Sequence, residues 1–310
     1  MQISGGISIT GGVSLTPPGG SPTPSYSFQG SNFGYTSGGN APPNVDTIDK
    51  FPFASDANAT DVGDLTQARY SVAGQSSSAS GYTSGGYVTS EIDTIDKFPF
   101  SSDANATDVG DLTQARNTVA GQSSSVSGYT SGGRNPSSVD TIDKFPFASD
   151  ANATDVGDLT QARRAVSGQS SSASGYTSGG FAPPFSNTID KFPFASDANA
   201  TDVGDLTVAR NVAAGQSSSA SGYTSGGNPA TNIIDKFPFA SDGNATDVGD
   251  LTVAIHSLAG QSSTASGYTS GGSAPAIVNT IDKFPFASDG NATDVGDLTQ
   301  ARNYVAGQQY

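Results

Sequence analysis

The stretch TIDKFPFASDANATDVGDLTQAR, at residues 47–69, decides the fold because it occurs six times along the chain with few changes. Its third residue recurs at intervals of 47, 47, 47, 45 and 47 residues, as Asp49, Asp96, Asp143, Asp190, Asp235 and Asp282. A second motif, GYTSGG, keeps the same rhythm, and its last glycine falls at 39, 86, 133, 180, 227 and 272. Repeats of about 40–50 residues are typical of propeller blades, which hold four strands each. The sequence therefore predicts an all-β, six-bladed β-propeller.

Clusters of Ser, Thr, Asn, Asp and Gly divide each unit into four short segments, as turn residues do between strands. No stretch shows a sustained period of 3.6 residues, so helices should be nearly absent. In the first full cycle, strands are expected at 71–77, 81–85, 47–53 and 59–66.

The aromatic residues that keep a fixed phase in the repeat are the expected core. Twelve of the 16 phenylalanines belong to the FPF pairs, and six of the 11 tyrosines belong to the GYT motifs. Burying one Phe contributes about 1.5–3 kcal/mol, so two per unit are too few for a unit to fold alone. We expect the units to bury these rings against one another around a ring of blades.

The two ends of the chain predict how this ring closes. The last residues, NYVAGQQY (303–310), align with the first-strand segment YSVAGQSS (70–77), and the repeats begin with a second-strand segment, NFGYTSGG (32–39). The C-terminal strand should complete the first blade and remove the open sheet edges. The expected domains are an N-terminal segment at 1–24 and the propeller at 25–310.

Composition excludes several classes of protein. The net charge of −15 disfavours binding to nucleic acid or to anionic membranes. No apolar run approaches the roughly 20 residues of a membrane span. The first 20 residues contain no Lys or Arg, unlike a usual signal peptide. Cysteine is absent, so the sequence says nothing about a redox compartment.

The units differ mainly at two positions, and alternating strand direction places both on one face of the disc. One is the loop between Gly-Gly and the third strand, and the other follows the Ala-Arg pair. Aromatic residues and Arg dominate interface energetics. The candidate partner-binding residues on this variable face are therefore Tyr70, Tyr87, Arg134, Arg164, Phe181, Phe185 and His256. The alternative is that these loops only tolerate change.

The repeated loop DANATDVGD offers oxygen atoms at alternate positions, and Asp56, Asn58 and Asp61 are the weak metal candidates. It lacks the Gly and the Glu of an EF-hand loop, so the preferred interpretation is a connector whose Asp and Asn side chains cap backbone amides, without calcium or another cofactor. Lys50 and Arg69 are expected to pair with repeated Asp residues, and Asp49 to belong to the same polar network. His256, the only histidine, has no companion nucleophile in the sequence. No catalytic residue is expected.

The repeat resembles the kelch motif, in which an aromatic residue precedes Gly-Gly, an acidic residue follows in a strand, and an Arg precedes the next blade. Tyr82, Gly85–Gly86, Asp96 and Arg116 carry this resemblance. The chain departs from kelch proteins in having no Trp and in having Ile255 at the Arg position of the fifth unit. The galactose-oxidase activity of some kelch proteins needs copper ligands from Tyr, His and usually Cys, which one His and no Cys cannot supply.

The sequence DKFPFASDANATDVGDLT, together with GYTSGG and an N-terminal GGISITGG segment, is similar to the sequences of kelch-like repeat proteins of aquatic bacteriophages. That resemblance implies a virion protein, such as a tail fibre, a receptor-binding protein or a decoration protein, which binds other virion proteins and reaches a host surface glycan. The alternating segment at 1–24 would be the anchor, through Ile3, Ile7, Ile9, Val13 and Leu15. A free, lectin-like glycan-binding propeller is the alternative, and neither would be an enzyme or insert into a membrane.

Overall fold

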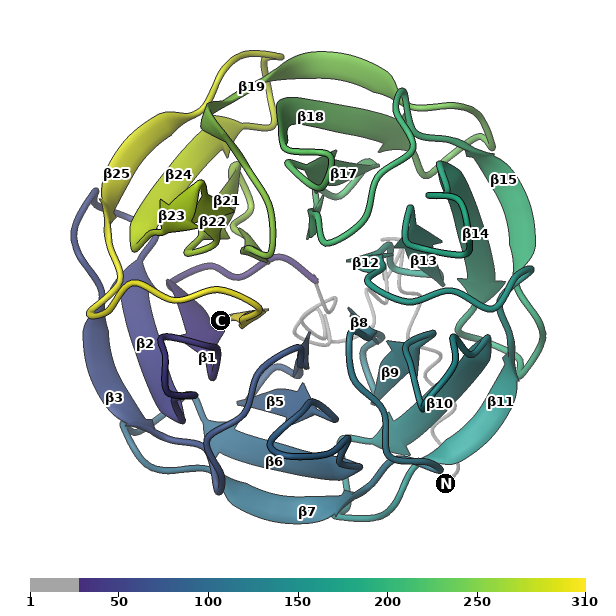
Figure 1. Cartoon of the computed structure of the whole chain (residues 1–310), viewed down its shortest axis with the longest axis horizontal. Helices are drawn as coiled ribbons and strands as arrows, with labels where there is room; N and C mark the ends of the chain where they lie inside the picture. The colour runs from purple at the N-terminus through teal and green to yellow at the C-terminus, as the bar shows by residue number, and fades with distance from the viewer. Residues whose placement is uncertain (1–27) are drawn as a thin grey trace, which may run out of the picture.

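The computed structural model describes residues 28–310, which form six four-stranded antiparallel sheets arranged as a ring (Figure 1). This confirms the predicted six-bladed β-propeller. The same residues contain no helix, and therefore none that is long and apolar enough to cross a membrane.

Each blade has one strand beside the central axis and three further strands outward. The innermost strands are β26 (Ala306–Gln309), β4 (Ala73–Ser76), β8 (Ala120–Ser123), β12 (Ser167–Ser170), β16 (Ala214–Ser217) and β20 (Ala259–Ser262). The second strands are β1 (Phe33–Ser37), β5 (Ser80–Ser84), β9 (Ser127–Ser131), β13 (Ser174–Ser178), β17 (Ser221–Ser225) and β21 (Ser266–Ser270). The third strands are β2 (Thr47–Pro52), β6 (Thr94–Pro99), β10 (Thr141–Pro146), β14 (Thr188–Pro193), β18 (Thr231–Pro238) and β24 (Thr280–Pro285). The outermost strands are β3 (Thr60–Asp64), β7 (Thr107–Asp111), β11 (Thr154–Asp158), β15 (Thr201–Asp205), β19 (Thr246–Ile255) and β25 (Thr293–Asp297).

All four strands predicted for the repeat are present, but the first begins later than expected. Ser71 has φ of 59°, a left-handed conformation that a β-strand cannot contain, so β4 starts only at Ala73. The fifth and sixth blades also depart from the pattern. β19 runs on to Ile255, and a small hairpin of β22 (Ser273–Ala274) and β23 (Ala276–Ile277) occupies the variable loop of the sixth blade.

The last strand closes the first blade, as the sequence predicts. β26 pairs antiparallel with β1, with Tyr35 opposite Gln308, and the sheet order of this blade is β26-β1-β2-β3. Two backbone hydrogen bonds of 2.8 Å between Phe33 and Tyr310 complete the pairing. The first blade therefore joins both ends of the described chain.

The tyrosine and phenylalanine rings pack between blades, which confirms the predicted core. Tyr35 of the first blade contacts Phe98 and Phe100 of the second, with ring centroids 5.5 and 5.0 Å apart. The contact repeats around the ring and ends with Tyr268 of the sixth blade against Phe51 and Phe53 of the first. Each of these tyrosines is at most 2% exposed. Every interface between blades thus uses residues of two repeats.

The glycine before each of these tyrosines leaves room for the phenylalanine of its own blade. A Cβ atom at Gly81 would lie 2.3 Å from Cζ of Phe98, which sits opposite it across the β5–β6 pair. No side chain tolerates that approach. The GYT motif is therefore a packing requirement of the blade.

Two kinds of ion pair join successive blades, and both confirm the predicted pairing of Lys and Arg with repeated Asp. Lys50 binds Asp103 at 2.9 Å near the surface, whereas Arg69 binds Asp96 at 3.0 Å with both side chains fully buried. Asp96 also accepts hydrogen bonds from the backbone and the hydroxyl of Thr66. Asp49 belongs to the same network through Arg302.

The fifth-to-sixth interface breaks this pattern. Ile255 stands where the other blades have Arg, and it is 5% exposed. Its expected partner, Asp282, keeps the hydrogen bonds from Thr252 but has an Oδ1 atom with no hydrogen-bond partner within residues 28–310. Burial raises the pKa of this carboxyl above its ordinary value.

Candidate functional site

The two variable positions of each blade lie side by side, joined by their backbones. Tyr70, for example, donates its N–H to the carbonyl of Tyr87 at 3.2 Å and accepts one in return at 2.9 Å. We name these the rim pairs. In blade order they are Asn40–Asn303, Tyr70–Tyr87, Asn117–Arg134, Arg164–Phe181, Asn211–Asn228 and His256–Ser273.

A ring of backbone hydrogen bonds lies directly after the rim pairs. Its six residues, the backbone ring, are Ser71, Thr118, Ala165, Val212, Ser257 and Tyr304, all with φ between 47° and 61°. Each N–H donates to the carbonyl of the ring residue in the preceding blade, at 2.7–2.9 Å, until the circle closes. Left-handed φ values are costly for β-branched residues such as Thr118 and Val212. The bonds between blades hold these residues in that conformation.

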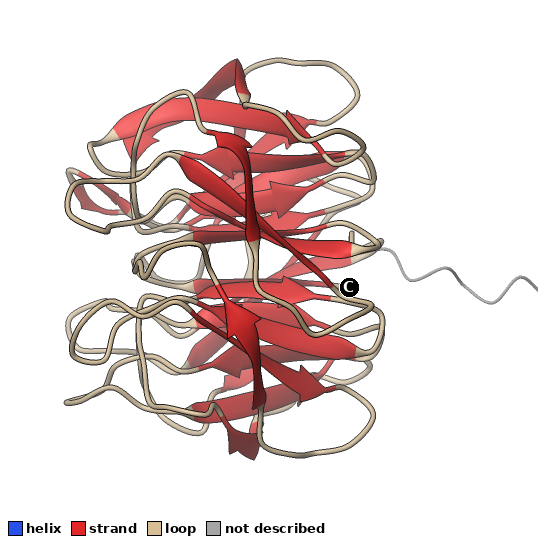
Figure 2. Ribbon diagram, turned by 90° about the vertical axis from the view of Figure 1, so that its right-hand side faces the viewer, coloured by secondary structure: helices blue, strands red, loops and turns tan. Residues whose placement is uncertain are grey.

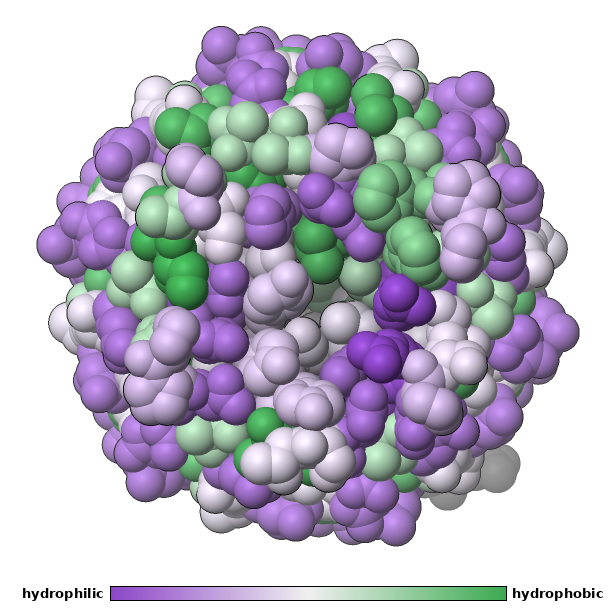
Figure 3. Space-filling view, viewed as in Figure 1, coloured by the Kyte–Doolittle hydropathy of each residue, from purple (hydrophilic) through white to green (hydrophobic). Residues whose placement is uncertain are grey.

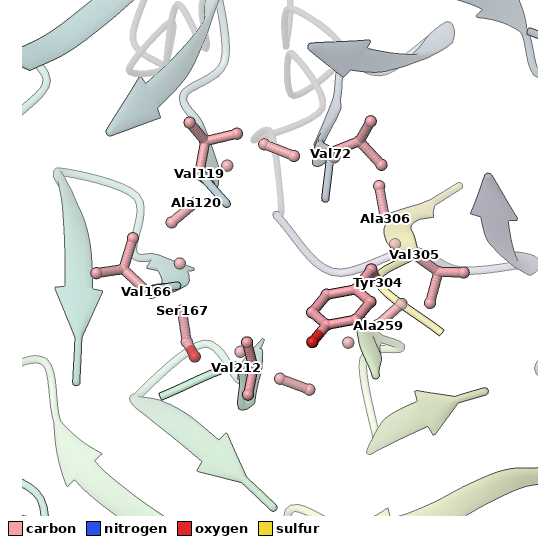
Figure 4. Close-up of a pocket in the computed structure, with 18 of the residues that line it drawn as sticks. Val72, Val119, Ala120, Val166, Ser167, Val212, Ala259, Tyr304, Val305 and Ala306 are labelled. Atoms are coloured by element: carbon pink, nitrogen blue, oxygen red, sulfur yellow. The ribbon is translucent and has the colours of Figure 1, made fainter. Parts of the chain in front are cut away.

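The backbone ring forms the mouth of a central channel with a volume of about 110 Å³. Its walls are the backbone ring and the three residues that follow it in each blade. Figure 4 shows the Tyr304 ring inside the circle formed by Val72, Val119, Val166, Val212 and Val305. Apart from Tyr304, the walls are backbone and small or aliphatic side chains, so the other chemically distinctive groups lie at the rim.

The other end of the channel is covered by the first described residues. The carbonyl of Phe28 accepts a hydrogen bond from Nε2 of Gln309 at 2.9 Å, and Phe28 lines a second, smaller cavity of about 30 Å³ there. Gly30 pairs with Ser263 beyond the end of β20. This end lies at the constant face, which carries the near-identical loops 77–79 and 54–58 and their equivalents. In Figure 1 the first described residues pass behind the centre of the ring, and the edge-on view of Figure 2 shows the C-terminus on that side.

One part of the rim is a cluster of three tyrosines. The Tyr70 ring lies 5.6 Å from that of Tyr87 and 5.9 Å from that of Tyr304, centroid to centroid. All three side chains are half-buried. Burial, and to a smaller degree Tyr87, raises the pKa of Tyr70, so its phenol stays neutral and can donate a hydrogen bond. Tyr304 was not among the residues predicted for the site, although its alignment with Ser71 shows that the sixth copy differs there.

A second cluster joins Arg and Phe side chains on the third and fourth blades. The Arg164 guanidinium lies over the Phe181 ring, with Cζ 4.5 Å from the centroid, and Phe185 meets Phe181 edge-on at 5.5 Å. Nη1 of Arg164 lies 3.3 Å from Oγ of Ser138, in the loop that Arg134 begins. The structure thus brings the four predicted residues to adjoining blades. Ser138, which joins the two loops, could not be singled out from the sequence.

The imidazole of His256 lies beside a buried hydroxyl group. Its Nδ1 atom is 2.9 Å from Oγ of the next residue, Ser257, because the left-handed turn of Ser257 brings the two side chains together. Burial lowers the pKa of His256, which is therefore neutral near pH 7. Ser257 is only 4% exposed, so the pair presents an imidazole to the rim rather than an open nucleophile.

Two of the metal candidates of the repeated loop, Asp56 and Asn58, bind residues of a neighbouring blade, whereas Asp61 caps a backbone N–H of its own blade. Asp56 pairs with Lys283 at 2.9 Å, Asn58 accepts the N–H of Asp297 at 3.1 Å, and Asp61 accepts the N–H of Gly63 at 3.1 Å. Residues 28–310 contain no group of three or more His, Cys, Asp and Glu side chains that could hold a metal ion. The loop acts as the backbone-capping connector that its sequence suggests.

The predicted anchor residues Ile3, Ile7, Ile9, Val13 and Leu15 lie outside the described residues. No protein-family model matches the chain, and no curated protein matches it.

Proposed function

We propose that this protein is a non-enzymatic binding protein that recognises its ligand with the rim pairs of the variable face. The observation that carries the proposal is the position of the differences among the blades. Six nearly identical units are unlike one another at the rim, where Tyr, Arg, Phe, His and Asn side chains surround one mouth of the channel. Binding residues are commonly found on loops that a rigid scaffold positions.

The symmetry of the blades supports binding over catalysis. Catalysis needs a nucleophile, a base and a stabilising group in one asymmetric arrangement. The repeated ionic side chains Arg69 and Asp96 are engaged with each other between blades. At the rim, the nearest approach to such an arrangement is His256 with the buried Ser257.

The finer form of the proposal is a phage virion protein, a tail fibre, receptor-binding or decoration protein anchored by residues 1–24. It rests on the similarity of the repeat to kelch-like repeat proteins of aquatic bacteriophages. The position of Phe28 supports it, because a segment that joins the propeller at the constant face would hold the variable face outward. A free, lectin-like propeller remains the second candidate.

A glycan array probed with the full chain tests the binding role. Two variants give the comparison: Tyr70→Asn with Tyr87→Asn, which copies the Asn211–Asn228 pair, and Val126→Ala on the constant face, which copies Ala79. We expect the wild type and Val126→Ala to bind the same glycans, and the tyrosine variant to lose or change them. Binding that depends on Val126, or that no rim substitution alters, would contradict the proposal. An absence of glycan binding together with ordered assembly onto capsid or tail proteins would favour a purely structural role.

A further inference from the structure

The cations of this acidic chain are almost all committed to ion pairs. The sequence has 13 Lys and Arg residues, none of them before residue 28. Eleven of them, six Lys and five Arg, pair with Asp side chains of neighbouring blades. Within the described residues, the two that form no ion pair are Arg134 and Arg164, and both belong to rim pairs.

These two arginines are close neighbours on the rim. Arg134 begins the variable loop of the third blade, and the guanidinium of Arg164 reaches into that loop to Ser138, 3.3 Å away. Arg134 is exposed and its Nε donates to the carbonyl of Pro136 at 2.8 Å, while Arg164 is half-buried. In Figure 3 the most hydrophilic surface lies at one edge of the central hollow, on the side where Figure 1 places β8 and β12.

An aromatic surface adjoins the two arginines. Phe181 lies beneath the Arg164 guanidinium, and Phe185 meets it edge-on. Both rings are half-buried, so each has one part packed and another part open. The arrangement combines two cations with a partly open aromatic surface.

We infer that this part of the rim binds an acidic polysaccharide, with Arg134 and Arg164 on its carboxylate or sulfate groups and Phe181 and Phe185 against the apolar face of a sugar ring. The inference rests on the proposed binding function and names its ligand class. A planar guanidinium donates two parallel N–H bonds to a carboxylate or sulfate, a geometry that an ammonium group lacks.

Charge decides between this ligand and other polyanions. A nucleic acid would bring one phosphate per nucleotide toward a protein with a net charge of −15, and two arginines do not offset that repulsion. A polysaccharide with one carboxylate per disaccharide brings fewer charges for its length and places a neutral, hydroxyl-rich ring between them, which Phe181 and Phe185 can contact. An acidic peptide offers no comparable ring to Phe181 and Phe185, and it serves as an outcome of the test.

The experiment measures binding of the full chain to hyaluronan, unsulfated chondroitin and neutral dextran by isothermal titration calorimetry. The variants are Arg134→Gln, Arg164→Gln, both together, and both changed to Lys. Lys191→Gln is the control, because it removes one positive charge from an outer ion pair with Asp242. We expect both acidic polysaccharides to bind and dextran not to bind. Each Gln substitution should weaken binding about 10-fold or more, as loss of a charged hydrogen bond does.

The double Lys variant and the control Lys191→Gln distinguish loss of guanidinium geometry from loss of charge. The Lys variant should bind more weakly than wild type, and Lys191→Gln should bind as wild type does. The inference is overturned if no polysaccharide binds, if dextran binds equally well, if the arginine variants bind normally, or if polyglutamate or oligo(dT) binds more tightly than the polysaccharides. A neutral glycan lost only in the Tyr70→Asn, Tyr87→Asn variant would overturn the acidic ligand but leave the binding function. Binding that no rim variant changes would overturn both.

Discussion

Asp282 occupies the same place in its blade as Asp235 does in the preceding one, yet the two carboxylates have different surroundings. Asp235 is fully buried against Arg210 at 3.1 Å, whereas Asp282 faces Ile255 and has one oxygen without a partner in the described chain. Removing one partner of a buried ion pair leaves an uncompensated charge, which costs about 3–5 kcal/mol. The carboxylate of Asp282 in the sixth blade is already such a charge. Its replacement by a neutral side chain should therefore stabilise the folded protein.

We therefore expect Asp235→Asn to lower the free energy of unfolding by about 3–5 kcal/mol near pH 7, and Asp282→Asn to raise it by about 1 kcal/mol. The raised pKa of Asp282 means that the folded protein binds this proton more tightly than the unfolded chain does. The penalty of its charge thus grows as the pH rises between the two pKa values, and the advantage of Asp282→Asn should vanish on acidification. Urea denaturation from about pH 4 to about pH 7 measures this; equal losses in both variants would contradict it.

At the scale of the element, the sequence predicts strands well and the turn before each inner strand poorly. The alternation and turn residues of the repeat place all four strands, because their hydrophobic and polar positions follow the pleat. The left-handed residue that precedes each inner strand carries no such signal. Ser, Thr, Ala, Val, Ser and Tyr fill this place in turn, and only bonds between blades impose the conformation. The sequence of one repeat therefore does not predict this conformation, because the hydrogen bonds that impose it form only between repeats.

This turn is strained most where a β-branched residue occupies it. Val212 has φ of 47° and is only half-buried. Burial of its side chain therefore offsets only part of the free-energy cost of the left-handed conformation. We expect Val212→Asn to raise stability by about 0.5–1 kcal/mol, because Asn tolerates left-handed φ far better than Val. Val119→Asn is the matched substitution one residue further along the repeat, where Val is 6% exposed, and it should be destabilising. Thermal denaturation compares the two; equal losses would show that the turn stores no strain.

At the scale of the whole molecule, closure and the faces of the disc follow from the sequence, while the details of the rim do not. The alignment of 303–310 with 70–77 predicts that β26 completes the first blade, and alternating strand direction puts both variable positions on one face. That these positions form backbone pairs, and that Tyr304 and Ser138 join them, depends on contacts between segments far apart in the chain. The position of Phe28 at the far end of the channel could not be predicted either, because Phe28 has no equivalent in the other repeats.

The position of Phe28 also defines where the propeller begins. Its carbonyl and the backbone of Gly30 both bond to inner strands or their ends, so these residues belong to the ring. Deletion of 1–24 should leave the melting temperature within about 2 °C of wild type, because the core and the closure are complete within 28–310. Deletion of 1–31 should lower it by several degrees, through loss of the bonds at Gly30. A propeller that unfolds without 1–24 would contradict this boundary, and normal virion incorporation of that variant would contradict the anchor.

The central claim is that the ring is a scaffold and that the differences at the rim carry recognition. Its most direct test is a chain in which every rim pair copies the Asn–Asn pairs of the first and fifth blades, through substitution of Asn at Tyr70, Tyr87, Arg134, Arg164, Phe181, His256 and Ser273. The measurement is binding of this variant to the array glycans that the wild type binds. Its melting temperature is measured in parallel. We predict an intact propeller with a nearly unchanged melting temperature and no binding. A folded variant that binds as the wild type does would contradict the account.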